Sequence, residues 1–332
     1  MDHPLKVIGV GSPIIDHLAH VDEEAISLLS GGKGGMQLVE TAVMDKLLGN
    51  LHDPVATAPG GSAANTSFAL ARLHVPAAIL GKVGDDRNGR FYCRSFEQIG
   101  GDASRIKVCP QRATACCLCL ITPDSERTMR TDLGAAAGLR PEEVLKEDFQ
   151  GYSHAHIEGY LLFNPALADS VLSAAKEAGC TVSLDLGSYE VVNENADILP
   201  GLLSEYVDVV MANEDEAAAF CGSEDAKAGL HALGALAPLA AVKLGQRGAY
   251  LKNGAHSCHV QARSVEDAED ATGAGDFWAA GFLYGHLQGY CLEDSGRFGA
   301  VLGAEAVRHV GANVPDEAWE QIAGLFGELK RT

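Results

Sequence analysis

The chain has 332 residues, of which 47% are hydrophobic and 21% are charged, a composition typical of a globular protein. Its net charge of -20 argues against nucleic acid as a partner, because a phosphate backbone requires a basic face. No apolar run approaches the roughly 20 residues that span a bilayer. The residues from Met1 to Pro4 lead directly into an apolar segment, and nine irregularly spaced cysteines do not suggest a disulfide framework. We therefore expect a cytoplasmic protein without a membrane or nucleic-acid partner.

Short apolar segments alternate along the chain with helical patterns. This alternation predicts a Rossmann-like α/β fold, with a mostly parallel sheet covered by helices on both faces. Ligands of such sheets bind beyond the carboxyl ends of the strands. The expected strands are 6–10, 77–80, 154–157, 181–184, 207–211 and 240–242, and the expected helices include 61–73, 166–178, 214–220 and a helical tail from Ala274 onward.

Two segments, approximately 12–59 and 109–134, interrupt the alternation. The first contains a glycine-rich turn at 31–35, and the second suggests two strands, 113–121 and 126–131, around a turn at 122–125. We expect both segments to form a small β lid over the main sheet. Because no low-complexity linker is evident, residues 1–332 are expected to form a single domain.

The most informative segment runs from Asp270 to Asp276 and precedes an apolar helix. Thr272 is expected to cap this helix, with Gly273, Ala274 and Gly275 in the first turn. Small residues there let an anion approach backbone N–H groups that have no helical partner. Such a site suits the charge that develops on a phosphoryl group during transfer. Asp276 follows directly and is expected to stay ionised and to accept the proton of an attacking hydroxyl.

A second segment begins at Gly60 and Gly61 and continues into a helix. The two glycines permit a close backbone approach, and Asn65, one turn into the helix, offers both a donor and an acceptor for hydroxyl groups. The same sequence pattern is also typical of an ordinary loop followed by a helix, without a binding role.

Other motifs in the chain are incomplete. Gly9 and Gly11 begin a dinucleotide fingerprint, but Ile14 stands where its third glycine belongs, which disfavours a dinucleotide-dependent oxidoreductase. Cys116 and Cys119 have the spacing of a metal-binding pair. Residues three apart in a strand face opposite sides, so we interpret them as buried thiols.

Together, residues 60–91 and 270–281 resemble the two signatures of the PfkB (ribokinase-like) family of carbohydrate and nucleoside kinases. The strand and helix pattern fits this family from Val7 to Gly311. The resemblance implies an enzyme with a ribokinase-like fold that uses ATP and Mg²⁺. It leaves K⁺ as an optional cation and a homodimer as an open alternative.

The resemblance also implies roles for individual residues. Asp276 matches the catalytic base, and Gly273, Ala274 and Gly275 match the anion hole. The residues that match the acceptor site are Ser12, Asp16, Gly60, Gly61 and Asn65. Those that match the ATP site are Asn213, Lys243, Gly245, Gly248 and Gly275, although the family often has Thr at the position of Lys243. Glu216 matches a Mg²⁺ residue acting through water, and Asp270 and Thr272 match a loop that binds a monovalent cation.

The acceptor is less clear from the sequence. The segment 185–189 lacks the Asn and Arg that several sugar kinases of the family carry, which weakens an acidic or phosphorylated sugar. The segment 11–16 is closer to adenosine kinases. Met36, Leu38 and Met129 could line a slot for a base or simply form the core of the lid. The hypothesis is transfer to a primary hydroxyl of an adenosine-like nucleoside, with ribose or fructose as the alternative and a non-catalytic sensor of nucleotides or sugars as the alternative of another class.

Overall fold

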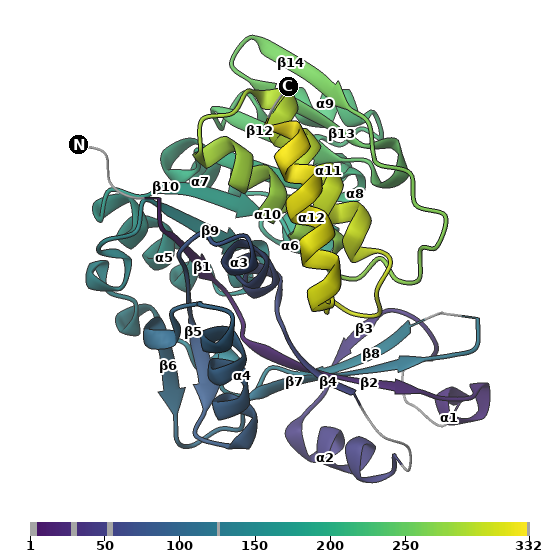
Figure 1. Cartoon of the computed structure of the whole chain (residues 1–332). Coiled ribbons are helices and arrows are strands. Elements are labelled where there is room, and N and C mark those ends of the chain that lie inside the picture. The colour runs from purple at the N-terminus through teal and green to yellow at the C-terminus, as the bar shows by residue number, and fades with distance from the viewer. Residues whose placement is uncertain (1–4, 28–31, 52–55, 125–126, 331–332) are drawn as a thin grey trace.

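The computed structural model describes residues 5–27, 32–51, 56–124 and 127–330. Figure 1 shows a larger α/β part, with a smaller β part projecting from one side of it. Gly31 of the predicted glycine-rich turn, Ser125 of the predicted lid turn and Glu126 of the predicted strand lie outside the described residues. Among those that are described, no helix has both the length and the apolar character needed to cross a membrane.

The larger part is built on a nine-stranded sheet with the order β14-β13-β12-β11-β10-β9-β1-β5-β6. All pairs from β12 to β6 are parallel, whereas β13 and β14 are antiparallel additions at one edge. Its strands are β1 (Val7–Val10), β5 (Ala77–Gly84), β6 (Ile106–Cys109), β9 (His154–Glu158), β10 (Thr181–Asp185), β11 (Val209–Asn213), β12 (Leu239–Lys243), β13 (Ala249–Asn253) and β14 (His256–Val260). The six strands expected for the main sheet are thus confirmed.

Helices cover both faces of this sheet, as Figure 1 shows. The helices of the larger part are α3 (Ser62–Arg72), α4 (Arg87–Gln98), α5 (Pro165–Glu177), α6 (Tyr189–Glu194), α7 (Leu199–Tyr206), α8 (Glu214–Cys221), α9 (Ala226–Leu233), α10 (Ala274–Leu287), α11 (Leu292–Ala306) and α12 (Asp316–Leu329). Two further helices, α1 (Glu23–Ser27) and α2 (Thr41–Gly49), lie beside the smaller part instead (Figure 1). Alternate strand residues enter different cores. Ile8 and Val10 pack with the helices α5 to α9, while Val7 packs with α3, α10, α11 and α12. The alternation follows from the two-residue period of a strand.

The smaller part is a five-stranded sheet with the order β3-β8-β7-β2-β4. Its strands are β2 (Ile14–His20), β3 (Met36–Leu38), β4 (Ala56–Gly60), β7 (Ala115–Ile121) and β8 (Arg127–Asp132). These strands come from within the two segments that interrupt the α/β alternation. We call this sheet the lid.

Two central helices, α10 and α11, pack so closely that their backbones are nearly in contact. An added Cβ at Gly281 of α10 would lie 2.3 Å from the Phe298 carbonyl oxygen of α11, and one at Gly299 of α11 would lie 2.9 Å from the Trp278 ring. Glycine is therefore required at both positions. The contact fixes the N-terminus of α10 relative to the C-terminal end of α11.

Candidate active site

Asp276 lies in the first turn of α10, half-buried beside α3. Ser62 Oγ donates a hydrogen bond to its Oδ1 at 2.8 Å, and Asn65 Nδ2 donates to its Oδ2 at 2.9 Å. Thr66 Oγ1 also donates to the Asp276 backbone oxygen. Helices α3 and α10, more than 200 residues apart in sequence, thus meet at a single carboxylate.

The ionisation of Asp276 differs from the expectation. The sequence analysis expected it to stay ionised at a helix N-terminus. Burial instead raises the pKa of Asp276 to about 7, with Asp185 adding to the shift and Asn65, Ser62 and Lys243 opposing it. Loss of hydration outweighs the two hydrogen bonds and the lysine, because a carboxylate removed from water loses more than a few donors restore.

The backbone at the start of α10 also differs in one detail. Gly273 is the N-cap residue, in the left-handed region with φ 74°, and no side chain caps the helix. The prediction that Thr272 caps it is wrong. Its hydroxyl oxygen instead accepts a hydrogen bond from Arg127 Nη1 at 3.1 Å. Ala274 and Gly275 occupy the first two helical positions, so the first-turn N–H groups stay free of side-chain caps.

Lys243 reaches this helix start from the end of β12. Its Nζ forms an ion pair with Asp185 Oδ2 at 2.5 Å, and a Cβ added at Gly275 would lie 3.2 Å from it. The carboxylates of Asp185 and Glu216 hold the pKa of Lys243 above its ordinary value, although burial of the ammonium group acts to lower it. A permanent positive charge therefore lies beside the uncapped helix start, where it favours an anion.

Asn213 and Glu216 form a capping box at the start of α8. Glu216 Oε2 accepts from the Asn213 backbone N–H at 2.8 Å, and Oε1 accepts from Asn213 Nδ2 at 2.7 Å. Burial, together with the nearby Asp185, raises the pKa of Glu216 to about 7. The buried carboxylates of Asp185 and Glu216 thus share the single positive charge of Lys243. A cation that prefers oxygen ligands, such as Mg²⁺, would relieve this excess of negative charge.

The loop between β12 and β13 requires glycine at two positions. Gly245 has φ 56° and Gly248 has φ 92°. A Cβ at Gly248 would lie 1.9 Å from the Val260 carbonyl oxygen, so this turn packs tightly against the end of β14. The loop follows Lys243 directly and lies at the same carboxyl edge of the sheet.

Asp16 and the two glycines meet where the lid joins the main sheet. A Cβ at Gly60 would lie 2.2 Å from Asp16 Oδ2, and one at Gly61, which has φ 105°, would lie 2.1 Å from the Ser12 carbonyl oxygen. The close approach expected of this pair is confirmed. Burial raises the pKa of Asp16 to about 7, with Arg127 opposing the shift and Asp276 adding to it.

Glu158 is a buried residue of the site that the sequence analysis missed. Its carboxylate accepts from the backbone N–H groups of Ser12 at 2.8 Å and Ala63 at 3.2 Å, so it connects the end of β1 to the start of α3. Burial raises the pKa of Glu158 to about 7. A carboxylate at the end of a buried strand was the signal in the sequence that could have identified it.

The register of the lid identifies the residues on its inner face. Asp16 pairs with Cys117, Cys117 pairs with Thr131, and Thr131 pairs with Leu38. The next row on the same face contains Leu18, Cys119, Met129 and Met36. Paired residues share a face of a sheet, so both rows continue the side on which Asp16 lies. Across the inner face, from β2 to β3, a carboxylate is thus followed by two thiols and then by Thr, Leu and Met side chains.

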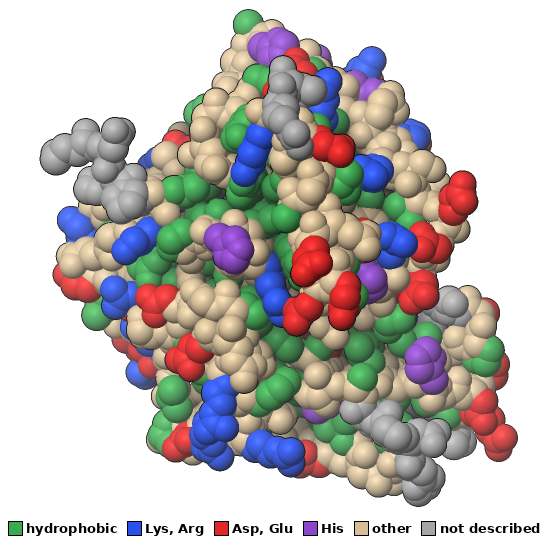
Figure 2. Space-filling view, in the orientation of Figure 1, with side chains coloured by type: hydrophobic (Ala, Val, Ile, Leu, Met, Phe, Trp, Pro, Cys, Tyr) green, Lys and Arg blue, Asp and Glu red, His purple; other side chains and the backbone are tan. Residues whose placement is uncertain are grey.

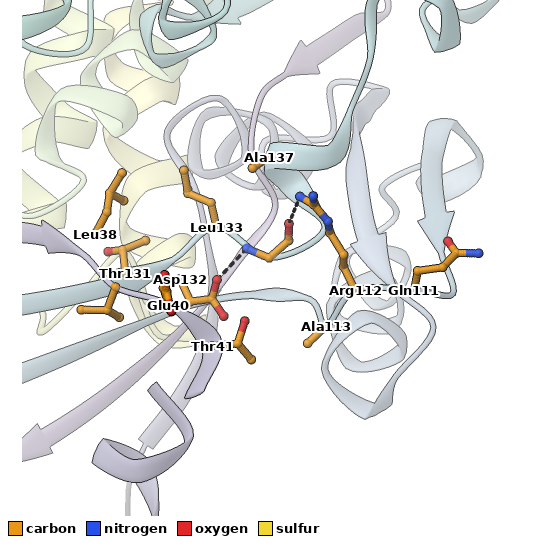
Figure 3. Close-up of a pocket in the computed structure, with 12 residues that line it drawn as sticks. Leu38, Glu40, Thr41, Gln111, Arg112, Ala113, Thr131, Asp132, Leu133 and Ala137 are labelled. Carbon is orange, nitrogen blue, oxygen red and sulfur yellow. Dashed lines mark hydrogen bonds between the residues drawn. The ribbon is translucent and has the colours of Figure 1, made fainter. Parts of the chain in front are cut away.

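Leu38 and Thr131 of this face line a cavity of about 480 Å³. Figure 3 shows Leu38, Thr131 and Leu133 on one side of it and Arg112 on the other, with Arg112 Nη1 donating to the Gly134 carbonyl oxygen at 3.5 Å. Green hydrophobic side chains are also visible in Figure 2 between the larger part and the lid. The space beside the lid therefore offers apolar contacts next to polar ones.

Arg127 is a second residue that the sequence analysis did not assign to the site. It begins β8 and reaches across to the loop before α10, where it pairs with Asp270. Asp270 Oδ2 also accepts from the Gly311 N–H at 2.6 Å, and its Oδ1 accepts from the Thr272 N–H at 3.0 Å.

The fold thus gathers the proposed residues into neighbouring groups. Asp276, Asn65, Lys243 and Gly275 surround the start of α10, and Asp16 is close enough for its pKa to respond to Asp276. Asn213 and Glu216 join them through Asp185 and Lys243. Asp270 and Thr272 lie in the loop before α10, where both contact Arg127.

Comparison with known proteins agrees with this geometry. The model of the pfkB family of carbohydrate kinases matches residues 48–319. The chain is 32% identical to an ATP-dependent ribose-1-phosphate kinase of Halopiger xanaduensis, covering 81% of this chain and 86% of that relative. It is 27% identical to adenosine kinase of Saccharomyces cerevisiae, covering 96% of this chain and 98% of that relative.

Solved structures agree as well. The crystal structure of adenosine kinase from Sinorhizobium meliloti superposes with a TM-score of 0.86 at 30% identity, covering 97% of this chain and 99% of that one. The expected ribokinase-like fold is confirmed, and with it a phosphotransferase. The chain therefore belongs to the pfkB family of carbohydrate kinases.

Proposed function

We propose that this kinase transfers the terminal phosphoryl group of ATP to a primary hydroxyl of a purine nucleoside such as adenosine. One observation carries the proposal: the inner face of the lid places thiol, methionine and leucine side chains beside the carboxylate of Asp16. Neighbouring strands lie about 4.8 Å apart, so Thr131 is roughly 10 Å from Asp16 across the lid. A purine nucleoside spans a comparable distance.

The acceptor binds by its two ends. Asp16 accepts hydrogen bonds from the vicinal hydroxyls of the ribose, a geometry that suits a carboxylate. Asn65, Ser12 and the glycine pair at 60 and 61 complete the sugar site. The base lies against Cys117, Cys119 and Met129, whose sulfur atoms make favourable contacts with an aromatic ring.

The phosphoryl group moves to the acceptor hydroxyl, which lies beside Asp276. ATP lies along Lys243, Gly245, Gly248 and Gly275, with its triphosphate at the start of α10. The N–H groups that follow Gly273 stabilise the charge on the phosphoryl group, and Asp276 orients the acceptor hydroxyl and takes its proton. Mg²⁺ held through water by Glu216 and Asn213 would neutralise phosphate charge when bound.

The test is turnover of ATP with a panel of adenosine, other nucleosides, ribose, fructose and ribose 1-phosphate. We expect kcat/KM to be highest for a purine nucleoside. The Halopiger relative makes ribose 1-phosphate an informative competitor, and a preference for it or for a free sugar would overturn the nucleoside assignment. Binding without turnover of any acceptor would favour a sensor instead.

Asp276→Asn tests the base separately. We expect kcat to fall about 100- to 10,000-fold, with ATP binding measured by calorimetry retained. Near-normal turnover in this variant would reject the assigned role of Asp276.

A further inference from the structure

A second group of metal-binding side chains lies far from the candidate active site. His256 and Cys258 extend from the edge strand β14, and Glu293 extends from the first turn of α11. One ligand atom from each lies within 4.8 Å of the others. His256 Nε2 and Glu293 Oε1 are already in contact at 2.7 Å.

The topology places this group at the opposite end of the sheet from the ATP site. His256 pairs with Asn253, which pairs with Leu239 at the start of β12. Lys243 ends β12 at the other edge. Figure 1 shows β14 on the side of the molecule away from the lid. The group is thus separate from the carboxylates that serve Mg²⁺.

The chemistry of the three side chains selects the metal. Imidazole, thiolate and carboxylate together form a borderline-soft set that suits Zn²⁺, whereas Mg²⁺ prefers oxygen ligands. His256 and Cys258 are two residues apart and therefore face the same side of β14. The neighbouring Cys291 donates its thiol hydrogen to Asp294 Oδ2 at 3.1 Å and is not one of the three clustered ligands, so a tetrahedral Zn²⁺ would have a fourth position open to water.

We propose that His256, Cys258 and Glu293 form a surface site for Zn²⁺ that connects the β13–β14 edge to the start of α11. Access is open, because the His256 side chain is 59% exposed and that of Glu293 is 37% exposed. Binding displaces the Cys258 proton, since thiolate is the form that coordinates metal. The site stabilises the folded chain by mass action and is independent of the acceptor.

The experiment uses the full chain, stripped of metal and titrated with Co²⁺ as a spectroscopic substitute for Zn²⁺. We expect one equivalent to produce a thiolate-to-cobalt charge-transfer band that Zn²⁺ abolishes. Cys258→Ser should remove the band, and His256→Ala should weaken binding more than about tenfold. His259→Ala on the same strand is the matched control and should bind Co²⁺ as the wild type does.

A second cluster that contains cysteines allows the experiment to distinguish the proposed site from an alternative one. Asp16, Cys117 and Cys119 also place one ligand atom each within 4.8 Å of one another, but they lie in the acceptor site beside Arg127, whose charge repels a cation. A band that survives Cys258→Ser and disappears in Cys117→Ser would overturn the proposal, as would the absence of any thiolate band. As a second readout, Zn²⁺ should raise the Tm of the wild type and leave that of Cys258→Ser unchanged.

Discussion

Arg127 of the lid forms an ion pair with Asp270 of the loop before α10, with Nη2 and Oδ2 2.5 Å apart. The side chains are 11% and 5% exposed, so the pair is buried. It joins the lid, which is proposed to cover the acceptor, to the loop before α10. The position of the lid is thereby linked to the helix start at which phosphoryl transfer is proposed to occur.

Replacing Arg127 tests this link. Arg127→Gln leaves the buried Asp270 without its cation, and such a loss is strongly destabilising. We expect kcat/KM for the acceptor to fall about tenfold or more. Arg72→Gln, which breaks a largely exposed pair with Asp316, is the control and should change kcat/KM less than about twofold. Equal effects of the two variants would contradict the link.

The same pair bears on monovalent cations. Asp270 accepts from two backbone N–H groups and pairs with Arg127, so K⁺ competes with the guanidinium for this carboxylate. We expect K⁺ to alter wild-type turnover little and to restore part of the activity of Arg127→Gln. Turnover measured in K⁺ and in tetramethylammonium salts of equal ionic strength checks this. Strong K⁺ dependence in the wild type alone would contradict it.

The pKa of Asp276 predicts a pH profile. Its proposed role requires the ionised form, and burial raises its pKa to about 7, so turnover should fall as the pH decreases through about 7. Ser62→Ala removes a hydrogen bond that favours the ionised form. Its acid limb should therefore move to higher pH, which kcat measured from pH 5 to 9 would show. An unmoved limb would mean that another group controls it.

The same shift predicts a cost in stability. Asp276 binds its proton more tightly in the folded chain, with a pKa of about 7 against an ordinary value of 3.8, so its contribution is most favourable below about pH 4 and is lost as the pH rises to about 7. Asp276→Asn removes this ionisation. We expect its Tm at pH 8 to exceed that of the wild type by about 1 to 3 °C, with the difference reduced at pH 4. A lower Tm at pH 8 would contradict the shift.

The inner face of the lid should control the affinity for the acceptor. Met129→Ala removes a large side chain from the proposed base site, and burial of such a side chain contributes about 1.5 to 3 kcal/mol, so the KM for adenosine should rise roughly 10- to 100-fold. The kcat should change little. Val43→Ala, at an exposed position of α2, is the control. A fall in kcat with an unchanged KM would place Met129 outside the base site.

Much of the fold could be predicted because local pattern and tertiary packing agree. The buried strands read as apolar runs, and the glycine pair at 60 and 61 indicated a close approach that the Asp16 and Ser12 contacts confirm. Glu158 and Arg127 were not assigned, because their roles depend on contacts with residues more than 90 positions away, although the position of Glu158 at the end of a buried strand was a usable signal. The cap at Thr272 failed for a different reason: Gly273 adopts a left-handed conformation that takes over the N-cap position.

The glycine contact between α10 and α11 has a consequence for engineering this kinase. Because the two backbones touch at Gly281 and Gly299, we expect the helix start proposed to receive phosphate to move together with the end of α11. We expect substitutions along the inner face of the lid, outside these two helices, to change the preference for acceptors more than the proposed chemistry of phosphate transfer.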